Sequence, residues 1–329
     1  MKTFIKRNYK FIIFLLVLCF ILTIKLPYYI YTPGGISDIN DKIEINGYNA
    51  SGTLNLAYVK EYHASVPTLL ISLFNKDWKV LKRNEVILNT ENEESYELRD
   101  RILLEESISN AIYVAYNKAN KSIKIKSSKI LVTYLTDICK TDLVVGDKIM
   151  SINSITINTK QDITNIINGL NIGDKLEIKV LNNNKEYSRY AYIINDNNSK
   201  KIGVLLSVVN EYETNPKVVV NVEKNESGSS GGLITALSIY NSLTKEDITK
   251  GLTIVGTGTI DVDGNIGSIG GVEYKLKSAV KNNADLFIVP QDENYDEVIR
   301  LKNENKYSIK IVGVSNIDEC IDYLKSVNG

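Results

Sequence analysis

The sequence has few of the residues from which several common catalytic sites are built. It contains one histidine and three cysteines, and the cysteines, Cys19, Cys139 and Cys320, lie far apart. A zinc site draws on several such ligands at short spacing, so the sequence predicts no metal site. A Ser/His/Asp triad would have to use His63, which lies in no recognisable catalytic motif and is expected to be a surface or packing residue.

A nucleotide site is equally unexpected. No phosphate-binding loop of the form Gly-x-x-x-x-Gly-Lys-Ser/Thr occurs, so we predict neither a bound nucleotide nor an organic cofactor. Lysine plus arginine and aspartate plus glutamate each number 39 in 329 residues, so no net charge attracts the chain to nucleic acid. This length suits about two domains and a short additional segment.

Residues 1–32 have the pattern of a membrane anchor. Four basic residues precede an apolar run over residues 11–24, and tyrosines follow the run, as at a membrane interface. A cleaved signal peptide is the alternative, but no small-x-small cleavage site follows the run. We therefore predict a cytoplasmic tail and an uncleaved transmembrane signal anchor, which place residues 33–329 of a single-pass membrane protein outside the cell.

The next region, residues 33–117, is predicted to be an extracytoplasmic N-terminal region that packs against the later domains. It contains short alternating segments that are typical of strands, such as residues 42–46. Residues 97–117 carry apolar side chains at helical spacing and therefore predict a helix.

A loop rich in serine and glycine, which turns directly into a helix, is the first candidate catalytic element. It reads Glu226-Ser-Gly-Ser-Ser-Gly-Gly-Leu233, and apolar residues then share one face of a helix predicted over residues 230–243. Free N–H groups at the start of this helix would lie beside a serine, which brings a nucleophile and oxyanion donors together. On its own the stretch is equally typical of a flexible linker.

A lysine at the start of a second helix is the candidate base. The segment Ile269-Gly-Gly-Val-Glu-Tyr-Lys275 forms a glycine turn that opens a helix predicted over residues 272–281. A lysine takes the proton of a serine hydroxyl only when it is neutral, and burial against an apolar helix face favours the neutral form. Thr257 lies in a strand predicted over residues 252–260 and could orient the amine of Lys275.

These three segments resemble the proteolytic domain of Lon-type proteases, which carry Gly-Pro-Ser-Ala-Gly at the nucleophile, a Thr-Gly strand, and Gly-Gly-x-x-x-Lys at the base. The resemblance covers residues 201–329 and implies a serine endopeptidase with Ser230 as nucleophile and Lys275 as base. The chain has Ser229 where the family has proline, and Gly231 where it has alanine, so Ser229 stays an alternative nucleophile. The resemblance also implies supporting roles for Thr257, Gly228, Gly270 and Gly271.

The segment Asp142-Leu-Val-Val-Gly-Asp-Lys-Ile-Met-Ser-Ile-Asn153 resembles the Leu-x-x-Gly-Asp-x-Ile-x-x-Ile-Asn signature of PDZ domains. Residues 162–167 stand where the groove helix of such a domain follows, and residues 121–132 and 175–181 alternate as strands. PDZ domains bind an extended peptide along a sheet edge. Their Gly-Leu-Gly-Phe loop, which binds a terminal carboxylate, is replaced here by residues 127–130.

The layout resembles membrane-anchored, PDZ-containing Lon-like serine proteases of Gram-positive bacteria, some of which mature secreted peptides. We predict a multi-domain fold with an N-terminal transmembrane helix, a β-rich PDZ-like domain and an α+β Lon-type proteolytic domain. The predicted bounds are 1–32 for the tail and anchor, 33–117 for the N-terminal region, 118–198 for the PDZ-like domain and 199–329 for the proteolytic domain.

The predicted function is ATP-independent cleavage of extracytoplasmic peptides or proteins, with maturation of a secreted peptide as one form of it. The predicted partners are a peptide or protein substrate and the membrane. The alternative is a catalytically lapsed, membrane-tethered protein that binds peptides through its PDZ-like domain. A comparison of peptide hydrolysis by the wild type and Ser230→Ala separates the two.

Overall fold

A computed structural model describes residues 2–327, and its largest feature is a six-stranded sheet. The strands run in the order β18-β17-β14-β3-β1-β4; β3, β14, β17 and β18 are mutually parallel, and β1 is antiparallel to β3 and to β4. Strands from the two ends of the chain therefore share one sheet, a pairing that the predicted division into 33–117 and 199–329 did not anticipate. The bounds are β1 Tyr28–Asp38, β3 Thr53–His63, β4 Lys79–Lys82, β14 Thr253–Gly256, β17 Leu286–Pro290 and β18 Lys310–Val314.

Helices cover both faces of this sheet, as buried parallel strands require. Leu54 and Ile254 point into one core, which they share with α6 and α9. Ala57 and Val255 point into the opposite core, which they share with α7 and α8. The helices predicted over residues 230–243 and 272–281 are confirmed as α6 Gly232–Leu243 and α7 Val272–Lys281, and the other two helices are α8 Glu293–Asn305 and α9 Ile317–Ser326.

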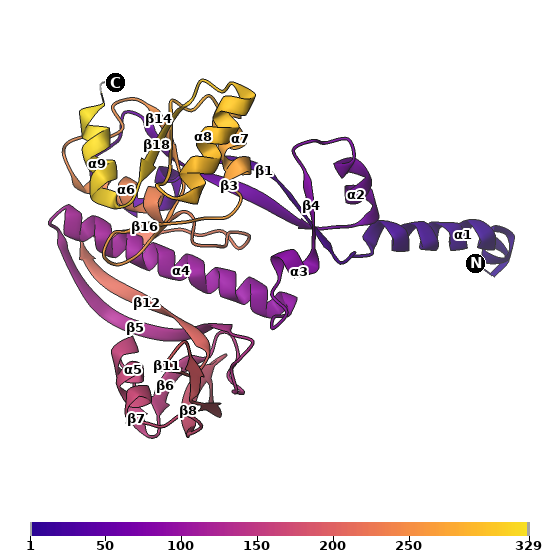
Figure 1. Ribbon diagram of the computed structural model, residues 1–329. Helices are drawn as coiled ribbons and strands as arrows, with labels where there is room; N and C mark the ends of the chain where they lie inside the picture. The colour runs from indigo at the N-terminus through magenta and orange to yellow at the C-terminus, as the bar shows by residue number, and fades with distance from the viewer. Residues whose placement is uncertain (1, 328–329) are drawn as a thin grey trace.

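A second sheet, in the order β12-β5-β6-β8-β9, forms a separate β-rich unit with its own core (Figure 1). Helix α5 supplies Ile163 and Ile167 to that core, and the short strand β7 pairs with β6. Because β12 pairs with β5, this sheet extends to Asn215, beyond residue 198. The bounds are β5 Ser122–Leu135, β6 Lys148–Ile152, β7 Ile155–Thr156, α5 Lys160–Asn168, β8 Lys175–Asn182, β9 Lys185–Tyr192 and β12 Val204–Asn215.

The long helix α4 (Glu93–Lys118) runs between the two sheets (Figure 1) and confirms the helix predicted over residues 97–117. The side chain of Asn92 caps it by accepting a hydrogen bond from the Ser95 N–H. Ile102 packs against Val145 and Val209 of the second unit, whereas Val114 belongs to the core of the first sheet. Helix α4 therefore contacts both units along its length.

The remaining elements are short. Strands β2 and β13 form an antiparallel pair, which confirms the strand predicted near residues 42–46, and β15 and β16 form a hairpin above α4 (Figure 1). The bounds are η1 Asn40–Lys42, β2 Ile43–Ile45, α2 Val66–Ser72, α3 Arg83–Val86, β10 Ile194–Asp196, β11 Ser199–Lys201, β13 Val218–Val220, β15 Thr259–Ile260 and β16 Ile266–Gly267.

Helix α1 (Lys2–Thr23) corrects the predicted fold class. Within residues 2–327, none of the helices combines the length and the apolar character that a membrane crossing requires. Lys6, Arg7 and Lys10 occupy the first half of α1, so its uncharged part covers only residues 11–23. At 1.5 Å per residue this part is about 20 Å long, against ~30 Å for a hydrocarbon core.

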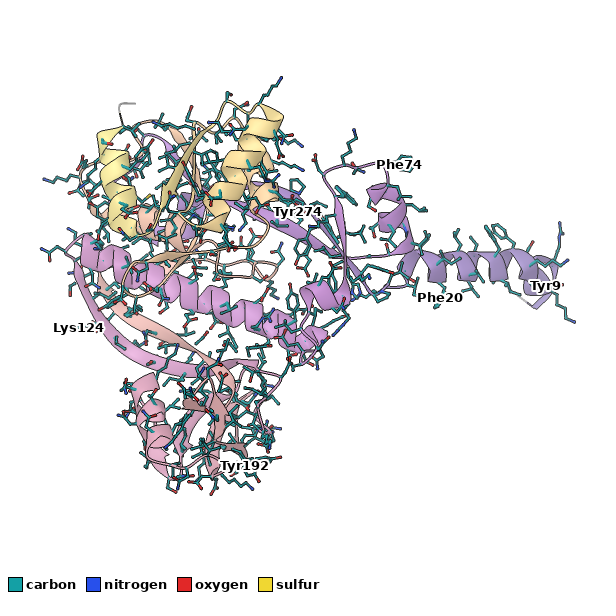
Figure 2. All side chains as sticks on the ribbon, in the orientation of Figure 1. Tyr9, Phe20, Phe74, Lys124, Tyr192 and Tyr274 are labelled. Atoms are coloured by element: carbon teal, nitrogen blue, oxygen red, sulfur yellow. The ribbon has the colours of Figure 1, made fainter. Side chains whose placement is uncertain are left out.

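The prediction of an N-terminal transmembrane helix is therefore wrong. The single-pass topology, with a cytoplasmic N-terminus and an extracellular catalytic domain, depended on that helix and is wrong with it. Attachment to a membrane through the helix is likewise unsupported. Helix α1 extends away from the rest of the molecule, with Tyr9 and Phe20 along it (Figure 2).

Candidate active site

Ser230 lies two residues before the first residue of α6, next to the N-cap residue Gly231, and is partly buried. Its carbonyl oxygen accepts a hydrogen bond from the Gly258 N–H at 2.9 Å, which fixes the turn into the helix. The helix then packs tightly: a Cβ atom on Gly232 would lie 2.7 Å from both Ile260 and Ser107. Within the described chain, neither the Ser230 nor the Gly231 N–H donates a hydrogen bond. These two donors are therefore available beside the Ser230 hydroxyl.

The loop before Ser230 is held in place at several points, so it is not a free linker. The Ser107 hydroxyl of α4 donates a hydrogen bond to the Ser229 carbonyl at 2.9 Å. The Gly228 N–H donates to the Asp100 carbonyl, also on α4, at 2.9 Å. Glu226, at the start of the loop, forms an ion pair with Lys42. Sequence reasoning missed the contribution of α4, because Ser107 and Asp100 belong to no motif.

Thr257 lies at the carboxyl end of β14, between the two helix-covered faces of the sheet. In open α/β sheets, this end of the parallel strands is where sites usually form. The Thr257 side chain is fully buried, and its hydroxyl donates a hydrogen bond to the Ser230 carbonyl at 3.2 Å. The strand predicted over residues 252–260 is interrupted here. The Gly258 N–H donates to the Ser230 carbonyl, and the Gly258 carbonyl accepts a hydrogen bond from the Leu233 N–H, so Gly258 does not continue the pairing between strands.

Lys275 lies on α7 and is only 3% exposed. Its amine donates a hydrogen bond to the Thr257 hydroxyl at 3.1 Å. Burial lowers the pKa of Lys275 from 10.5 to about 7, because the charged form loses its hydration and, among the described residues, no carboxylate forms an ion pair with it. Lys277, two residues along the same helix, instead forms an ion pair with Asp77 at 2.9 Å. Lys275 is therefore buried with a pKa near neutrality, whereas Lys277 is paired at the surface.

Two of the three predicted glycines have a conformational reason. Gly271 precedes α7 in the left-handed region (φ 66°), and a Cβ atom there would lie 2.9 Å from Val59. Gly228 also has a positive φ of 84°, with open space around its Cα. Gly270 shows neither a positive φ nor a close neighbour. Gly271 thus sets the direction in which α7 leaves the turn, and with it the position of Lys275.

The structure brings Ser230, Thr257 and Lys275 together from opposite faces of one sheet. The connection runs from the lysine amine to the threonine hydroxyl and from there to the backbone carbonyl of Ser230. Among the described residues, the Ser230 hydroxyl makes no direct hydrogen bond to Lys275. Serine–base contacts in unliganded sites are often long and tighten when substrate binds.

His63 and the cysteines lie outside this arrangement. The His63 ring stacks on Tyr29 and its Nε2 lies 2.9 Å from the Leu26 carbonyl, so the packing role expected for it is confirmed. In the part of the chain that the structure describes, no three His, Cys, Asp or Glu side chains gather as metal ligands would.

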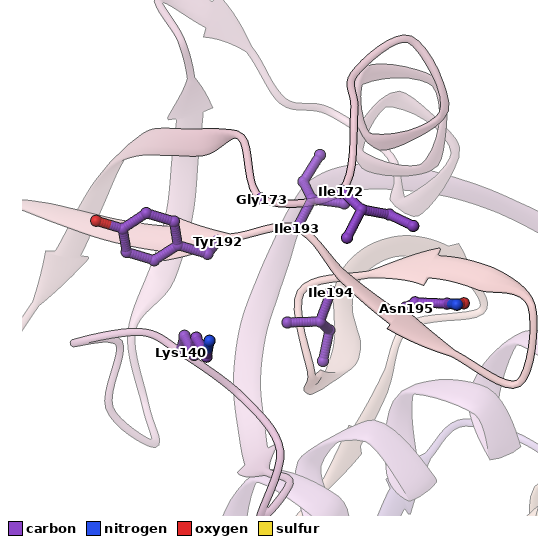
Figure 3. A pocket seen from close by; sticks show the side chains of 7 residues that line it. All are labelled: Lys140, Ile172, Gly173, Tyr192, Ile193, Ile194 and Asn195. Atoms are coloured by element: carbon purple, nitrogen blue, oxygen red, sulfur yellow. The ribbon is translucent and has the colours of Figure 1, made fainter.

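Two hollows lie in different parts of the molecule. A cleft of about 380 Å³ borders Ser229 and lies between α4 and the β15–β16 hairpin. A cavity of about 460 Å³ lies in the second unit, lined by residues such as Lys140, Ile172 and Tyr192 (Figure 3). The lining of this cavity contains no serine or threonine, whereas the cleft is bordered by Ser229, the residue before Ser230.

Comparison with known proteins identifies the family. Residues 143–326, more than half of the chain, match the model of the Lon protease (S16) C-terminal proteolytic domain. The chain belongs to this Lon protease family. Its proteolytic domain is consistent with serine protease activity.

Among curated relatives, the Lon protease of Aster yellows witches'-broom phytoplasma is 34% identical over 94 residues, which cover 29% of this chain and 12% of the relative. The archaeal Lon protease of Halobacterium salinarum is 29% identical over 114 residues, covering 35% of this chain and 16% of that protein. The chain therefore spans only a small part of the length of these relatives.

One solved structure to which part of the chain is similar is the PDZ domain of an SdrC-like protein from Listeria monocytogenes. It is 19% identical, covers 25% of this chain and 92% of that domain, and superimposes with a TM-score of 0.23.

Proposed function

We propose that this chain is a serine endopeptidase in which Ser230 is the nucleophile and Lys275 is the general base. The observation that carries the proposal is the buried Lys275 amine, which has a pKa near neutrality and is hydrogen-bonded to Thr257 at 3.1 Å. A structural lysine gains nothing from such a position, because burial without an ion pair destabilises the charged form. Membership of the Lon family supports the same reading.

The reaction follows from the chemistry of these groups. Neutral Lys275 accepts the proton of the Ser230 hydroxyl as the serine oxygen attacks the scissile carbonyl. The N–H groups of Ser230 and Gly231, together with the positive end of α6, stabilise the oxyanion of the tetrahedral intermediate. The lysine ammonium then protonates the leaving amine, and the regenerated neutral lysine activates the water that hydrolyses the acyl-enzyme.

Thr257 is proposed to act as a positioning residue. Its hydroxyl accepts a hydrogen bond from Lys275 and donates one to the Ser230 carbonyl, so it holds the amine of the base at a fixed position relative to the loop that carries the nucleophile. A lysine side chain has four rotatable bonds, and a fixed acceptor restricts the positions of its amine. Gly228, Gly270 and Gly271 are proposed to shape the two turns that bring these residues together.

The domain division and the role of the β-rich unit remain proposals. We propose that this unit, predicted as a PDZ-like domain over residues 118–198, presents peptide segments to the site. Strand β12 is an edge of its sheet, and an edge strand can pair with an extended peptide. Helix α4 occupies part of that edge, because Glu106 accepts a hydrogen bond from the Val208 N–H at 2.8 Å.

Hydrolysis of an unstructured peptide, without nucleotide or metal, tests the proposed function. We expect wild type and Ser229→Ala to cleave it, and Ser230→Ala and Lys275→Arg to lose nearly all activity, because arginine stays protonated. Lys277→Arg is the matched control on the same helix and should stay active. An active Lys275→Arg variant would exclude lysine as the base. Peptide binding by a wild type that cleaves nothing would favour the lapsed, peptide-binding alternative.

A further inference from the structure

The cleft that borders Ser229 is formed by two elements that face each other. Leu103, Glu106, Ser107 and Asn110 line it from α4, and their spacing places them in one stripe of the helix. The opposite wall is the hairpin from Thr259 to Gly267. The Asn110 side chain donates a hydrogen bond to the Ile260 carbonyl at 3.1 Å and so ties the two walls together.

The cleft has a one-sided charge. Its lining contains two carboxylates, Glu106 from one wall and Asp261 from the other, and no lysine, arginine or histidine. Among the described residues, neither carboxylate takes part in an ion pair. The whole chain has equal numbers of acidic and basic residues, so this imbalance is local.

Both carboxylates are held in place by neutral donors. Glu106 accepts hydrogen bonds from the Ser207 hydroxyl at 2.7 Å and the Val208 N–H at 2.8 Å. Asp261 accepts from the Asn265 N–H at 2.9 Å and from the Asn265 side chain at 2.8 Å. Such bonds fix the oxygen atoms without cancelling their charge, and carboxylate oxygens retain further lone pairs for a cation.

We propose that this cleft binds a lysine or arginine side chain of the substrate next to the scissile bond. Leu103, Ile260 and Ile266 provide apolar surface for the methylene stem of such a side chain, while its charged end reaches Glu106 and Asp261. A volume of about 380 Å³ is at the small end of ligand clefts and suits a side chain rather than a folded segment. The inference rests on the proposed function, since it assigns the cleft to the substrate of the Ser230 site.

Two peptides test the proposal. They differ only in the central residue, lysine or glutamine, which is flanked on each side by three alanines. Full-length wild type should show a kcat/KM on the order of tenfold higher for the lysine peptide at low ionic strength. In Asp261→Asn and in Glu106→Gln, the ratio between the two peptides should fall toward one. Asp263→Asn and Glu105→Gln, which change neighbouring acids outside the cleft, should keep the wild-type ratio.

Binding to Ser230→Ala separates this proposal from the proposed function. Fluorescein-labelled forms of the same peptides are titrated against Ser230→Ala alone and against Ser230→Ala combined with Asp261→Asn. Preferential binding of the lysine peptide, lost in the double variant, supports the cleft proposal even if the wild type cleaves nothing. Cleavage of both peptides at equal rates overturns the cleft proposal and leaves the protease assignment intact. A lysine preference that survives both Asp261→Asn and Glu106→Gln also overturns it.

Discussion

Replacement of Lys275 by methionine should stabilise the protein while it abolishes activity. Methionine fills nearly the same volume without a charge, and the site is almost fully buried. Burial lowers the pKa of Lys275 from 10.5 to about 7, so protonation of this lysine destabilises the folded protein. In the unfolded chain the lysine is exposed to water and keeps its ordinary pKa, so it is protonated throughout the neutral range.

The size of the effect follows from proton linkage. Between the two pKa values the unfolded state binds more protons, so the stability of the wild type rises with pH in that window. With 1.36 kcal/mol for each pKa unit, the protonation penalty on the folded state is about 4 kcal/mol at pH 7 and about 2 kcal/mol at pH 9. The lost hydrogen bond to Thr257 offsets about 1 kcal/mol of the gain. Lys275→Met should therefore gain about 3 kcal/mol at pH 7 and about 1 kcal/mol at pH 9.

Urea denaturation of both proteins at several pH values between 6 and 9 measures these differences. The matched control is Lys277→Met, which removes an ion pair with Asp77 at the surface of the same helix. Its free energy of unfolding should change by less than about 1 kcal/mol, with no trend across that pH range. A Lys275→Met protein that is less stable than the wild type at pH 7 would refute the reasoning. So would a gain that does not shrink as the pH rises.

Two further predictions concern activity. The wild-type kcat/KM for a peptide without ionisable groups should rise with pH and level off above about 7, because only the neutral form of Lys275 accepts the serine proton; a flat profile down to pH 5 would contradict this. Ser107→Ala should lower kcat on the order of tenfold with KM little changed, because the Ser229 carbonyl loses its hydrogen-bond donor. Ser109→Ala, an equally buried serine of α4 that binds Asn210 instead, should stay within about twofold of wild-type kcat; equal losses in both would assign the effect to helix packing.

Local patterns in the sequence were sufficient to predict the elements that carry the candidate site. Helix α7 begins and ends at the predicted residues, because glycine precedes it and its apolar side chains recur at helical spacing. Helix α6 was also expected at the correct place, and the buried position of Lys275 agrees with its location beside the apolar face of α7.

Contacts between distant segments could not be read in the same way. Strand β3 pairs in parallel with β14, about two hundred residues later, and no local pattern specifies such a partner. The support that Ser107 gives to the nucleophile loop is of the same kind, since a buried serine in a helix carries no sign of its partner. Ser107 and Ser109 lie in the polar stretch Glu105-Glu-Ser-Ile-Ser-Asn110, so their residue types did not distinguish them from exposed neighbours.

The N-terminal helix shows where a correct pattern led to a wrong conclusion. The apolar run over residues 11–24 does form a helix, as its composition favours. However, the helix ends at Thr23, and the basic residues shorten its uncharged part below the thickness of a membrane. Flanking residues cannot supply the missing length once the helix has ended.

The most direct test of the central claim is to locate the reactive serine by its covalent adduct. A fluorophosphonate reacts with a serine only when a base activates its hydroxyl, and mass spectrometry of the digested protein identifies the modified residue. We expect one adduct at Ser230 in the wild type and in Lys277→Met, and none in Lys275→Met. An adduct at Ser229, or labelling of Ser230 that persists in Lys275→Met, would contradict the proposed pairing of Ser230 with Lys275.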